Sequence, residues 1–504
     1  MPSDSQELLL ETMLRLRESV YREGLEQFHA WRSSVGRPSF LPGALNLAFY
    51  LALRRHDLRP LQHALKPLGL STLGRSEAGA IAGLDAVIAS LACLAGRQDR
   101  IAVRHPRPER FYAGERNLER QARLLFGSRP ATRQSRIMVT LDETCVEEYG
   151  TVKSLLAAGM NVARINCAHG GPEIWTAMVR NVRRAERETG RSCRVLMELA
   201  GAKIRISRVM LMGFPARVEA GDRLLLTKDV SHPPQFRPRQ PITALLECTC
   251  PQELDLLRPG DPVHIDDGKI NGEVEAAYAG QALVKVENTV KQKPVRLKTG
   301  KGLNFPLRAP LGPAVTAKDR QDLNIILPLT DLLGLSWVKT ADDISALQAE
   351  LADRLGERAR RLPLVAKIET AEAVSRLPEI IVRAASRQPL ALMIARGDLA
   401  LEVGYERLAE LQEEVLWISE AAHVPVIWAT QVLENLVKYG APSRAEITDA
   451  AMSERAECVM LNKGPYIVEG VSLLDKVLAR MDEHQRKKAA RLGIMNMTGD
   501  EPTS

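Results

Sequence analysis

Leu364-Val365-Ala366-Lys367-Ile368, followed by an amphipathic stretch and then by Ala391-Leu392-Met393-Ile394-Ala395, shows the pattern that decides the fold of this chain. Each run is short and almost continuously apolar, which is typical of strands buried on both faces of a parallel sheet. Eight such runs occur after residue 136, most of them followed by a helical pattern: 137–141, 162–166, 195–199, 332–338, 364–368, 391–395, 425–430 and 458–462. Eight strand–helix units predict a closed (β/α)₈ TIM barrel.

The regular spacing is interrupted once, by a long segment between the third and the fourth run. This segment holds strand-like runs at 223–226, 262–265, 269–275 and 283–287. Turn signals such as Pro259-Gly260 and Asp266-Asp267-Gly268 separate them. We predict a small all-β domain inserted into a barrel loop, where it would form a lid over the active site.

The residues before the barrel have a helical pattern. Apolar side chains recur at helical spacing at Leu8, Leu9, Met13, Leu16, Val20 and Leu25, and further helical runs cover 41–53 and 78–94. We interpret the basic stretch at 116–136 as a solvated linker helix rather than a polyanion site, because acidic and apolar residues are interleaved with it. The expected domains are a helical N-terminal region at 1–130, a barrel at 131–206 and 304–483, a lid at 207–303 and a C-terminal tail at 484–504.

Composition excludes several classes of protein. Over 504 residues, 45% are hydrophobic and 26% charged, which excludes collagen-like and wholly disordered chains. The seven cysteines form neither a disulfide framework nor a zinc motif, and a net charge of +7 is too small to indicate nucleic-acid binding. The apolar stretch at 78–96 carries Asp85, which favours a buried helix over a membrane span, and the acidic N-terminus lacks the features of a secretory signal. We expect a cytoplasmic protein that binds neither nucleic acid nor membrane.

Polar side chains gather at the ends of the predicted strands, where barrel enzymes have their active sites. They are Arg164 and Asn166 in the second run, Glu198 in the third, Lys367 and Glu369 at the fifth, Arg396, Gly397 and Asp398 after the sixth, and Thr430 and Gln431 at the seventh. A polar residue at the end of a buried strand is costly unless it is satisfied, so five such ends favour a site over a set of rim salt bridges. Glu369 and Asp398 suit a hard divalent cation, above all Mg²⁺, while Arg164 and Lys367 complement phosphate charge.

Several stretches carry a family resemblance. They are 159–170 (Gly-Met-Asn-Val-Ala-Arg-Ile-Asn-Cys-Ala-His-Gly), Val263-His264-Ile265-Asp266-Asp267-Gly268, Lys301-Gly302-Leu303-Asn304-Phe305-Pro306, Ala366-Lys367-Ile368-Glu369, 393–399, 427–434, and Ser443-Arg444-Ala445-Glu446 with Asp449. From about residue 136 to 480, in matching order, the chain resembles the pyruvate kinase family. The resemblance implies a glycolytic enzyme that transfers the phosphoryl group of phosphoenolpyruvate to ADP, giving pyruvate and ATP.

The resemblance also implies a role for each matching residue. Lys367 would stabilise charge on the phosphoryl group and the enolate, Arg164 would bind the phosphoryl group, and Thr430 would help to protonate the enolate carbon. Glu369 and Asp398 would bind Mg²⁺ or Mn²⁺, and Gly397 with Asp398 would receive the substrate carboxylate. The nucleotide side would include Asn166, His169 and Arg205. The expected partners are phosphoenolpyruvate, ADP or ATP, and pyruvate, bound by a homo-oligomer.

Departures from the family pattern affect the monovalent-cation site. Of its four ligands only Asn166 is kept, and the other three positions hold Ala168, Glu198 and Leu199. Lys203 stands where potassium-dependent members carry glutamate, which resembles potassium-independent members, and an ammonium can replace a monovalent cation electrostatically. We therefore expect no requirement for K⁺, with Asn166, Glu198 and Lys203 forming this region.

Further departures leave alternative functions open. The loop after the first strand is Leu141-Asp142-Glu143-Thr144, the loop after the eighth is Asn462-Lys463-Gly464-Pro465, and Ala200 replaces a lysine. Little chain follows residue 480, so we expect the family's C-terminal regulatory domain to be absent. The alternatives are another enzyme that acts on phosphoenolpyruvate or a 2-oxo acid enolate, and a catalytically weak regulatory or binding homologue. The intact lysine and metal positions argue against the latter.

Overall fold

The computed structural model describes residues 4–213, 217–231, 241–278, 280–306, 312–487 and 489–490. At its centre is the predicted barrel, in which eight parallel strands close on themselves in the order β1-β2-β3-β13-β14-β15-β16-β17. The strands are β1 (Arg136–Thr140), β2 (Val162–Asn166), β3 (Arg194–Glu198), β13 (Leu332–Leu335), β14 (Leu364–Ile368), β15 (Leu390–Ala395), β16 (Val426–Ala429) and β17 (Cys458–Leu461). All eight predicted strands are confirmed, and their near-complete burial explains why the apolar runs are continuous.

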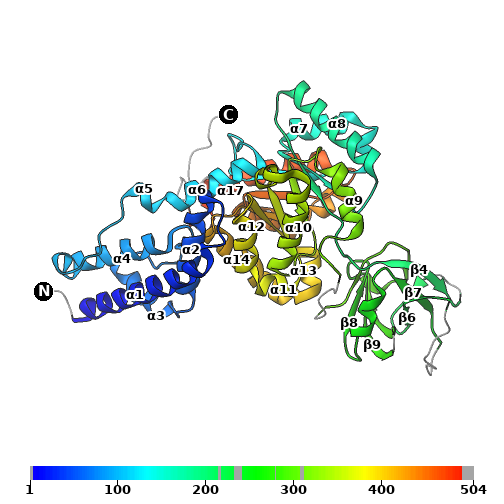
Figure 1. The fold of residues 1–504 in the computed structure, drawn as a ribbon, viewed down its shortest axis with the longest axis horizontal. Coiled ribbons are helices and arrows are strands. Elements are labelled where there is room, and N and C mark those ends of the chain that lie inside the picture. Colours follow the sequence, from blue (N-terminus) through cyan, green and yellow to red (C-terminus); the bar gives the residue numbers. More distant parts are fainter. Residues whose placement is uncertain are drawn as a thin grey trace.

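Helices surround this barrel and lie on its outer face (Figure 1). They are α7 (Tyr149–Ala158), α8 (Pro172–Thr189), α9 (Ala317–Ile326), α10 (Ala341–Leu355), α11 (Ala371–Ser375), α12 (Leu377–Ala385), α13 (Arg396–Val403), α14 (Tyr405–Ala421), α15 (Glu434–Tyr439), α16 (Arg444–Met452) and α17 (Ile467–His484). Capping boxes at Thr316, Thr340 and Ser443 start α9, α10 and α16, because each hydroxyl accepts a backbone N–H of the first turn. These helix starts fix where the preceding loops turn back toward the barrel.

The inserted lid is a separate β domain, as predicted. Its seven-stranded sheet has the order β12-β8-β9-β10-β6-β7-β4, and β5 pairs with β11 beside it. The strands are β4 (Ile206–Leu211), β5 (Arg217–Val218), β6 (Arg223–Thr227), β7 (Ala244–Cys248), β8 (Pro262–Ile265), β9 (Ile270–Tyr278), β10 (Gln281–Thr289), β11 (Val295–Arg296) and β12 (Leu303–Asn304). The sheet thus extends one residue beyond the expected range of 207–303 at each end. The sequence analysis predicted β6, β8, β9 and β10 but not the other five strands.

Two antiparallel segments connect the lid to the barrel, and we call them the neck (residues 200–206 and 298–305). The Ile206 amide donates to the Lys301 carbonyl over 2.8 Å, and the Leu303 amide donates to the Ile204 carbonyl over 2.9 Å. Arg205 and Gly302 form an isolated antiparallel bridge between them. Figure 1 shows the lid standing off the barrel at the end of this neck.

The N-terminal region is helical, as predicted, and lies at the other end of the barrel from the lid (Figure 1). Its helices are α1 (Asp4–Arg32), α2 (Leu41–Arg54), α3 (Arg59–Leu65), α4 (Ala80–Leu94), α5 (Pro108–Phe111) and α6 (Ala113–Phe126). Helix α2 packs on α14 so closely that a Cβ at Gly43 would lie 2.2 Å from the Ala422 carbonyl oxygen. The Asn46 amide donates to the Ala421 carbonyl over 2.9 Å. The helical region is therefore part of the barrel's packing rather than a loose appendage.

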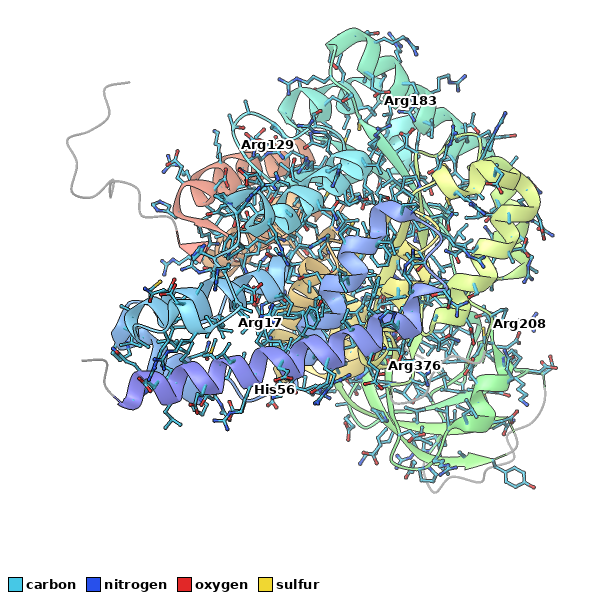
Figure 2. All side chains as sticks on the ribbon, turned by 60° about the vertical axis from the view of Figure 1, so that its left-hand side comes forward. Arg17, His56, Arg129, Arg183, Arg208 and Arg376 are labelled. Carbon is cyan, nitrogen blue, oxygen red and sulfur yellow. The ribbon has the colours of Figure 1, made fainter. Side chains whose placement is uncertain are left out.

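The apolar segment Glu77–Leu94 is long enough to cross a membrane, and 56% of it is buried inside this structure. Asp85 in its middle forms an ion pair with Arg17 on α1 at 2.5 Å. Figure 2 shows Arg17 on the long first helix, with further arginines on the barrel helices and on the lid. The acid within the apolar stretch is thus satisfied inside the helical region, as expected of a core helix.

The expectation of a solvated linker at 116–136 is wrong at its end. Arg133 and Arg136 are buried, because Arg133 pairs with Asp475 at 2.6 Å and Arg136 pairs with Glu119 at 2.8 Å.

Of the predicted tail at 484–504, the short strands β18 (Gln485–Arg486) and β19 (Ala489–Ala490) are part of the structure, and residues 491–504 lie outside the described residues. Short 3₁₀ turns join several of the helices and strands, among them Pro38–Phe40, Lys66–Leu68, Glu77–Gly79, Gln98–Arg100, Glu143–Val146, Pro251–Leu256, Val290–Gln292, Gly356–Arg361 and Ser453–Arg455.

Candidate active site

A cleft lies between the carboxyl ends of the barrel strands and the lid. The predicted residues that line it are Arg164, Asn166, His169, Glu198, Lys203, Arg205, Lys367, Gly397, Asp398 and Thr430. The lid contributes Asp266 and Asp267, and Lys301 of the neck also faces the cleft. Glu369 is fully buried directly behind Lys367 and is not among the lining residues. The structure therefore gathers the predicted site residues in and just behind one cleft.

Glu198 joins the two buried cations of the site. Its carboxylate accepts two hydrogen bonds from the Arg164 guanidinium, at 2.8 and 2.7 Å, and one from the Lys367 ammonium at 3.1 Å. Burial raises the pKa of Glu198, but Arg164 and Lys367 outweigh it and lower this pKa to about 2. Burial likewise lowers the pKa of Lys367, but Glu198 and Glu369 hold it above its usual value. Both cations are thus charged and held in place at the floor of the cleft.

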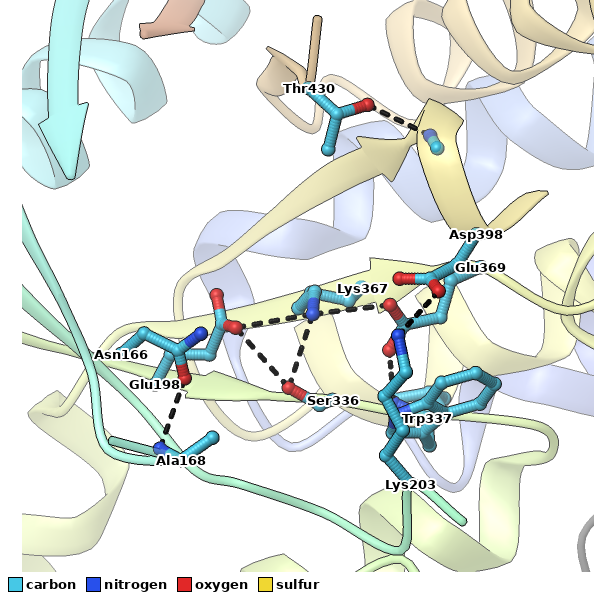
Figure 3. A network of polar contacts seen from close by, with 12 residues as sticks. Asn166, Ala168, Glu198, Lys203, Ser336, Trp337, Lys367, Glu369, Asp398 and Thr430 are labelled. Atoms are coloured by element: carbon cyan, nitrogen blue, oxygen red, sulfur yellow. Dashed lines mark hydrogen bonds and ion pairs between the residues drawn. The ribbon is translucent and has the colours of Figure 1, made fainter. Parts of the chain in front are cut away.

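Glu369, which follows β14, is held by the loop that follows β13. Its Oε1 accepts the Trp337 backbone N–H at 2.5 Å, and its Oε2 lies 3.1 Å from the Lys367 ammonium. Trp337 follows β13 with a φ of 59°, which aims its amide at the carboxylate. Burial raises the pKa of Glu369, Lys367 opposes this, and Asp398 raises it further. Figure 3 shows Glu369 and Asp398 side by side at one edge of the network.

Lys203 occupies the outer part of the same network. Its ammonium donates to Asp398 Oδ1 at 2.8 Å and to Asp267 Oδ1 at 3.2 Å. It lies 5.7 Å from the centre of the Trp337 ring, within the range of a cation–π contact. Burial lowers the pKa of Lys203, but Asp398 and Asp267 outweigh it and raise the value. One cation therefore links a barrel carboxylate to a lid carboxylate.

The carboxylates at this edge fit a hard divalent cation. Within the described ranges no group of three or more His, Cys, Asp or Glu side chains is arranged as a metal site. Mg²⁺, however, commonly binds through one or two carboxylates together with substrate oxygens and water. Glu369 Oε2 is buried with no hydrogen-bond donor among the described residues other than its ion-pair partner Lys367. Glu369 and Asp398 are thus a suitable oxygen pair for such an ion.

A strained loop after β16 positions Thr430. Thr430 and Gln431 have φ values of 65° and 58°, in the left-handed region that non-glycine residues seldom adopt. The Thr430 hydroxyl accepts the Gly397 N–H at 2.8 Å, and the Arg396 guanidinium donates to the Thr430 carbonyl at 2.5 Å. Arg396 is fixed in turn by Asp449, with one contact of 2.9 Å. Helix α13 begins at Arg396, so the helix turn expected around Gly397 and Asp398 is present.

The residues assigned to the nucleotide side come from the end of β2 and the loop after it and from the neck, and all of them line the cleft. Arg205 belongs to the neck and donates to the Gly300 carbonyl at 3.0 Å, and the carbonyl of His169 accepts the Trp175 indole N–H at 2.8 Å. Burial lowers the pKa of His169, and Arg205 and Lys463 lower it further. The Asn166 side chain accepts the Ala168 N–H at 3.0 Å. Figure 3 shows Asn166 and Glu198 on one side of Lys367 and Lys203 on the other.

Sequence reasoning did not include several residues that organise the site. Ser336 accepts from Lys367 at 3.3 Å, and Thr140 accepts from Arg164 at 2.9 Å. The polar Ser336 inside the apolar run at 332–338 is the signal that would have found it. Asp267 belongs to the motif at 263–268, but no feature of the neighbouring sequence indicates that its side chain contacts Lys203. The role of Trp337 depends on a backbone conformation that its residue type does not indicate.

Comparisons with known proteins agree with this architecture. The family model "Pyruvate kinase, barrel domain" matches residues 132–471. A pyruvate kinase of Mycobacterium tuberculosis is 31% identical over 360 residues, which cover 70% of this chain and 71% of the relative. A pyruvate kinase of Dictyostelium discoideum is 29% identical over 383 residues, covering 74% of this chain and 71% of the relative. The crystal structure of a pyruvate kinase from Cryptosporidium parvum superposes with a TM-score of 0.60 at 26% identity over 69% of each chain. The barrel, its inserted lid and these similarities together show that the chain belongs to the pyruvate kinase family.

Proposed function

We propose that this protein transfers the phosphoryl group of phosphoenolpyruvate to ADP, giving pyruvate and ATP. The observation that supports it best is the pair of buried cations, Arg164 and Lys367, held on one carboxylate beside Glu369 and Asp398. Phosphoryl transfer needs positioning and charge neutralisation more than covalent chemistry by the protein. Two fixed cations at the floor of the cleft, together with two neighbouring carboxylates that suit a divalent cation, would meet that need.

In this proposal, Arg164 binds the phosphoryl oxygens, and Lys367 lies beside the bond between phosphorus and the enol oxygen. That bond breaks as a bond forms between phosphorus and an oxygen of the ADP β-phosphate, so charge builds on the enol oxygen. Lys367 is preorganised by Glu198, Glu369 and Ser336 and does not have to reorient as this charge develops. Its hydrogen bonds to Glu198 and Ser336 use two of its three donor hydrogens, and the third is left for the enol oxygen.

The resulting enolate takes a proton at carbon to become pyruvate. Thr430 accepts a bond from Gly397, and this leaves its own hydroxyl proton available for donation into the cleft. In this proposal the first turn of α13 at Gly397 and Asp398 receives the substrate carboxylate through backbone N–H groups of the helix N-terminus, apart from that of Gly397, which already donates to Thr430. Asn166, His169 and Arg205 bind the nucleotide in this proposal.

A Mg²⁺ or Mn²⁺ ion, when bound by Glu369 and Asp398, supplies further neutralisation of phosphate charge. K⁺ is not required, because Lys203 brings a permanent charge close to Asp398. The cytoplasmic location and the homo-oligomeric state remain predictions from sequence.

The test is a lactate-dehydrogenase-coupled assay with phosphoenolpyruvate, ADP and Mg²⁺. We expect turnover that needs all three and that falls by about 10²–10³ in Lys367→Met. If the pure protein binds phosphoenolpyruvate but forms no ATP with ADP or with other nucleoside diphosphates, the proposed reaction is wrong. The weak regulatory homologue would then be the better description.

One observation favours the related-enzyme alternative, an action on the enolate of another 2-oxo acid. The two loops that depart from the family pattern follow the neighbouring strands β1 and β17, and the Lys463 ammonium of one lies 3.2 Å from the Asp142 carboxylate of the other. Lys463 also acts electrostatically on His169, a residue that lines the cleft. Proton exchange at C3 of pyruvate and of longer 2-oxo acids in D₂O, followed by NMR, separates the two functions. Faster exchange of a longer acid than of pyruvate would favour the alternative.

A further inference from the structure

A second pocket lies at the end of the barrel opposite the catalytic cleft. Strands β1 and β17 begin side by side there, with Arg136 opposite Cys458. The pocket is bounded by the residues just before these two strands, by the last turn of α14 and by the N-terminal helical region. The space inside it measures about 120 Å³, many times the roughly 10–15 Å³ that one water molecule needs. None of the described residues that line it belongs to the predicted active site.

Buried polar groups form the wall of this pocket. The side chains of Glu454 and Glu457 belong to residues that are only 4% and 8% exposed. The Ser135 hydroxyl donates to the Ala456 carbonyl at 2.7 Å. Glu457 Oε2 accepts the Val426 N–H at 2.9 Å. These contacts join the segment before β1, the start of β16 and the segment before β17, so the pocket has a fixed shape.

The lining of the pocket carries a negative charge. Six glutamates and three cations line it in the described part of the chain, which gives a formal excess of three negative charges. One of the cations, Arg136, is completely buried and is already bound to Glu119, with contacts of 2.8 and 3.2 Å. A recessed pocket whose lining carries a net charge of one sign concentrates ions of the other sign. We therefore expect this pocket to attract cations.

The chain itself shows which kind of cation fits. Lys487, which follows β18, reaches into the pocket, where its ammonium donates to the Arg455 carbonyl at 2.7 Å and forms an ion pair with Glu457 Oε1. Only 22% of this side chain is exposed. Burial lowers the pKa of Lys487, but Glu457 and Glu420 outweigh it and raise the value. The pocket thus holds a charged primary ammonium at the end of a four-carbon chain, and it has space left beside it.

We propose that this pocket binds primary alkylammonium groups, with Lys487 as the built-in occupant, and that a free linear diamine competes with this lysine. One ammonium of the diamine takes the place of the Lys487 ammonium at the Arg455 carbonyl and Glu457. The second ammonium lies in the space beside it, where it meets the negative charge that one lysine does not balance. Such binding does not depend on phosphoryl transfer, because the pocket and the catalytic cleft lie at opposite ends of the barrel.

The first test removes the built-in occupant and adds it back. Lys487 has a φ of 55°, a conformation that glycine adopts freely, so Lys487→Gly deletes the side chain without straining the backbone. We expect this variant to unfold at a lower urea concentration than the unchanged protein, because Glu457 loses its shielded partner. Because n-butylammonium has the shape and charge of the missing side chain, it should restore most of the lost midpoint.

Three controls separate this rescue from a general effect of salt. Lys487→Met keeps a carbon chain in the pocket and should not respond to n-butylammonium. Tetramethylammonium at the same ionic strength should not restore Lys487→Gly. Lys476→Met, which removes an exposed lysine of α17 and changes the net charge equally, should keep the midpoint of the unchanged protein.

The second test is isothermal titration with 1,4-diaminobutane. We expect it to bind Lys487→Gly about tenfold more tightly than the unchanged protein, the ratio for a site that the tethered lysine leaves open about a tenth of the time. Adding Glu457→Gln to Lys487→Gly should abolish this binding, since the amide oxygen can still accept the Val426 N–H but carries no charge. Circular dichroism confirms that each variant is folded.

The possible outcomes decide both parts of the proposal. If n-butylammonium does not rescue Lys487→Gly, or rescues Lys487→Met equally, the pocket is not an ammonium site. If the diamine binds the unchanged protein and Lys487→Gly equally, or binds the variant alone, a free cation does not compete with Lys487. None of these readouts uses turnover, so a failed ammonium site and a failed kinase assignment are told apart.

Discussion

The carboxylate of Glu198 accepts two parallel hydrogen bonds from the guanidinium of Arg164, at 2.8 and 2.7 Å. Both side chains are buried, and Lys367 shares the same carboxylate. Glu198→Gln should lower the free energy of unfolding by about 3 to 5 kcal/mol, because two buried cations lose the charge that compensates them. Urea denaturation measures this. Glu188→Gln, which breaks exposed pairs on α8, is the control and should leave the midpoint unchanged; an equal effect of both changes would contradict the prediction.

Lys367→Met should reduce kcat by about 10²–10³ while the fold stays intact. Its charge stabilises the transition state more than the bound substrate, so kcat falls more than KM rises. Steady-state kinetics in the coupled assay, with the melting temperature as a check, tests this. Lys153→Met, which removes an exposed lysine of α7, should retain full turnover. Near-normal turnover of Lys367→Met would remove this lysine from the reaction.

Glu369→Gln and Asp398→Asn should each raise the Mg²⁺ concentration needed for half-maximal activity. A neutral amide keeps the shape of the carboxylate but loses its charge toward a hard cation. Isothermal titration with Mn²⁺ checks binding without depending on turnover. Glu372→Gln on α11 serves as the control, since its carboxylate pairs only with the exposed Arg376 among the ion pairs found in the described ranges. Unchanged metal titrations of both site variants would exclude these residues as ligands.

Activity should be present in buffer with neither sodium nor potassium and should rise little when KCl is added. Ala168 and Leu199 offer no side-chain oxygens to a K⁺ ion, and Lys203 supplies a fixed charge near Asp398. Initial rates in a tetramethylammonium buffer, titrated with KCl, give the measurement. Lys203→Glu should lose most of the activity, with no recovery in K⁺. Strong activation of the unchanged protein by K⁺ would refute this.

Glu402, one turn after Asp398 on α13, should make the protein less stable as the pH rises. Burial, together with the charge of Asp398, raises the pKa of Glu402 from 4.5 to about 7. The folded state therefore keeps this proton to a higher pH than the unfolded state, so stability declines between these two values and the loss is complete above pH 7. Glu402→Gln cannot ionise and should gain about 1 to 3 kcal/mol over the unchanged protein at pH 8 and nothing at pH 4.5. Urea denaturation without divalent cations measures this, with the exposed Glu406→Gln as control, and a Glu402→Gln variant that gains no stability between pH 4.5 and pH 8 would contradict the raised pKa.

The barrel was predictable from sequence because parallel strands buried on both faces leave continuous apolar runs, and a polar residue that ends such a run stands out. Lys367 and Glu369 are examples, since both interrupt or follow the run at 364–368. The lid was harder to predict. β4 is exposed along most of its length, so its residues carry no alternating pattern, and β12 has only two residues.

Contacts between distant parts of the chain were not predictable from local pattern. Arg133 is buried only because Asp475, 342 residues later, lies beside it. Lys203 was expected beside Asn166 and Glu198, yet its ammonium contacts Asp398 and Asp267, 195 and 64 residues away. Such pairings depend on how the closed barrel and the neck bring loops together, and a sequence gives residue types without these distances.

The neck has a consequence for how the chain reaches its native state. β3 and β13 are neighbours in the barrel, with Leu196 opposite Leu332, although the whole lid separates them in sequence. Because Arg205 and Gly302 face each other, a lid that folds first brings these two strands together and replaces a long loop closure by a short one. An insertion whose ends meet in this way slows assembly of the host barrel little, and replacing it by a tight turn would leave the order of the barrel strands unchanged.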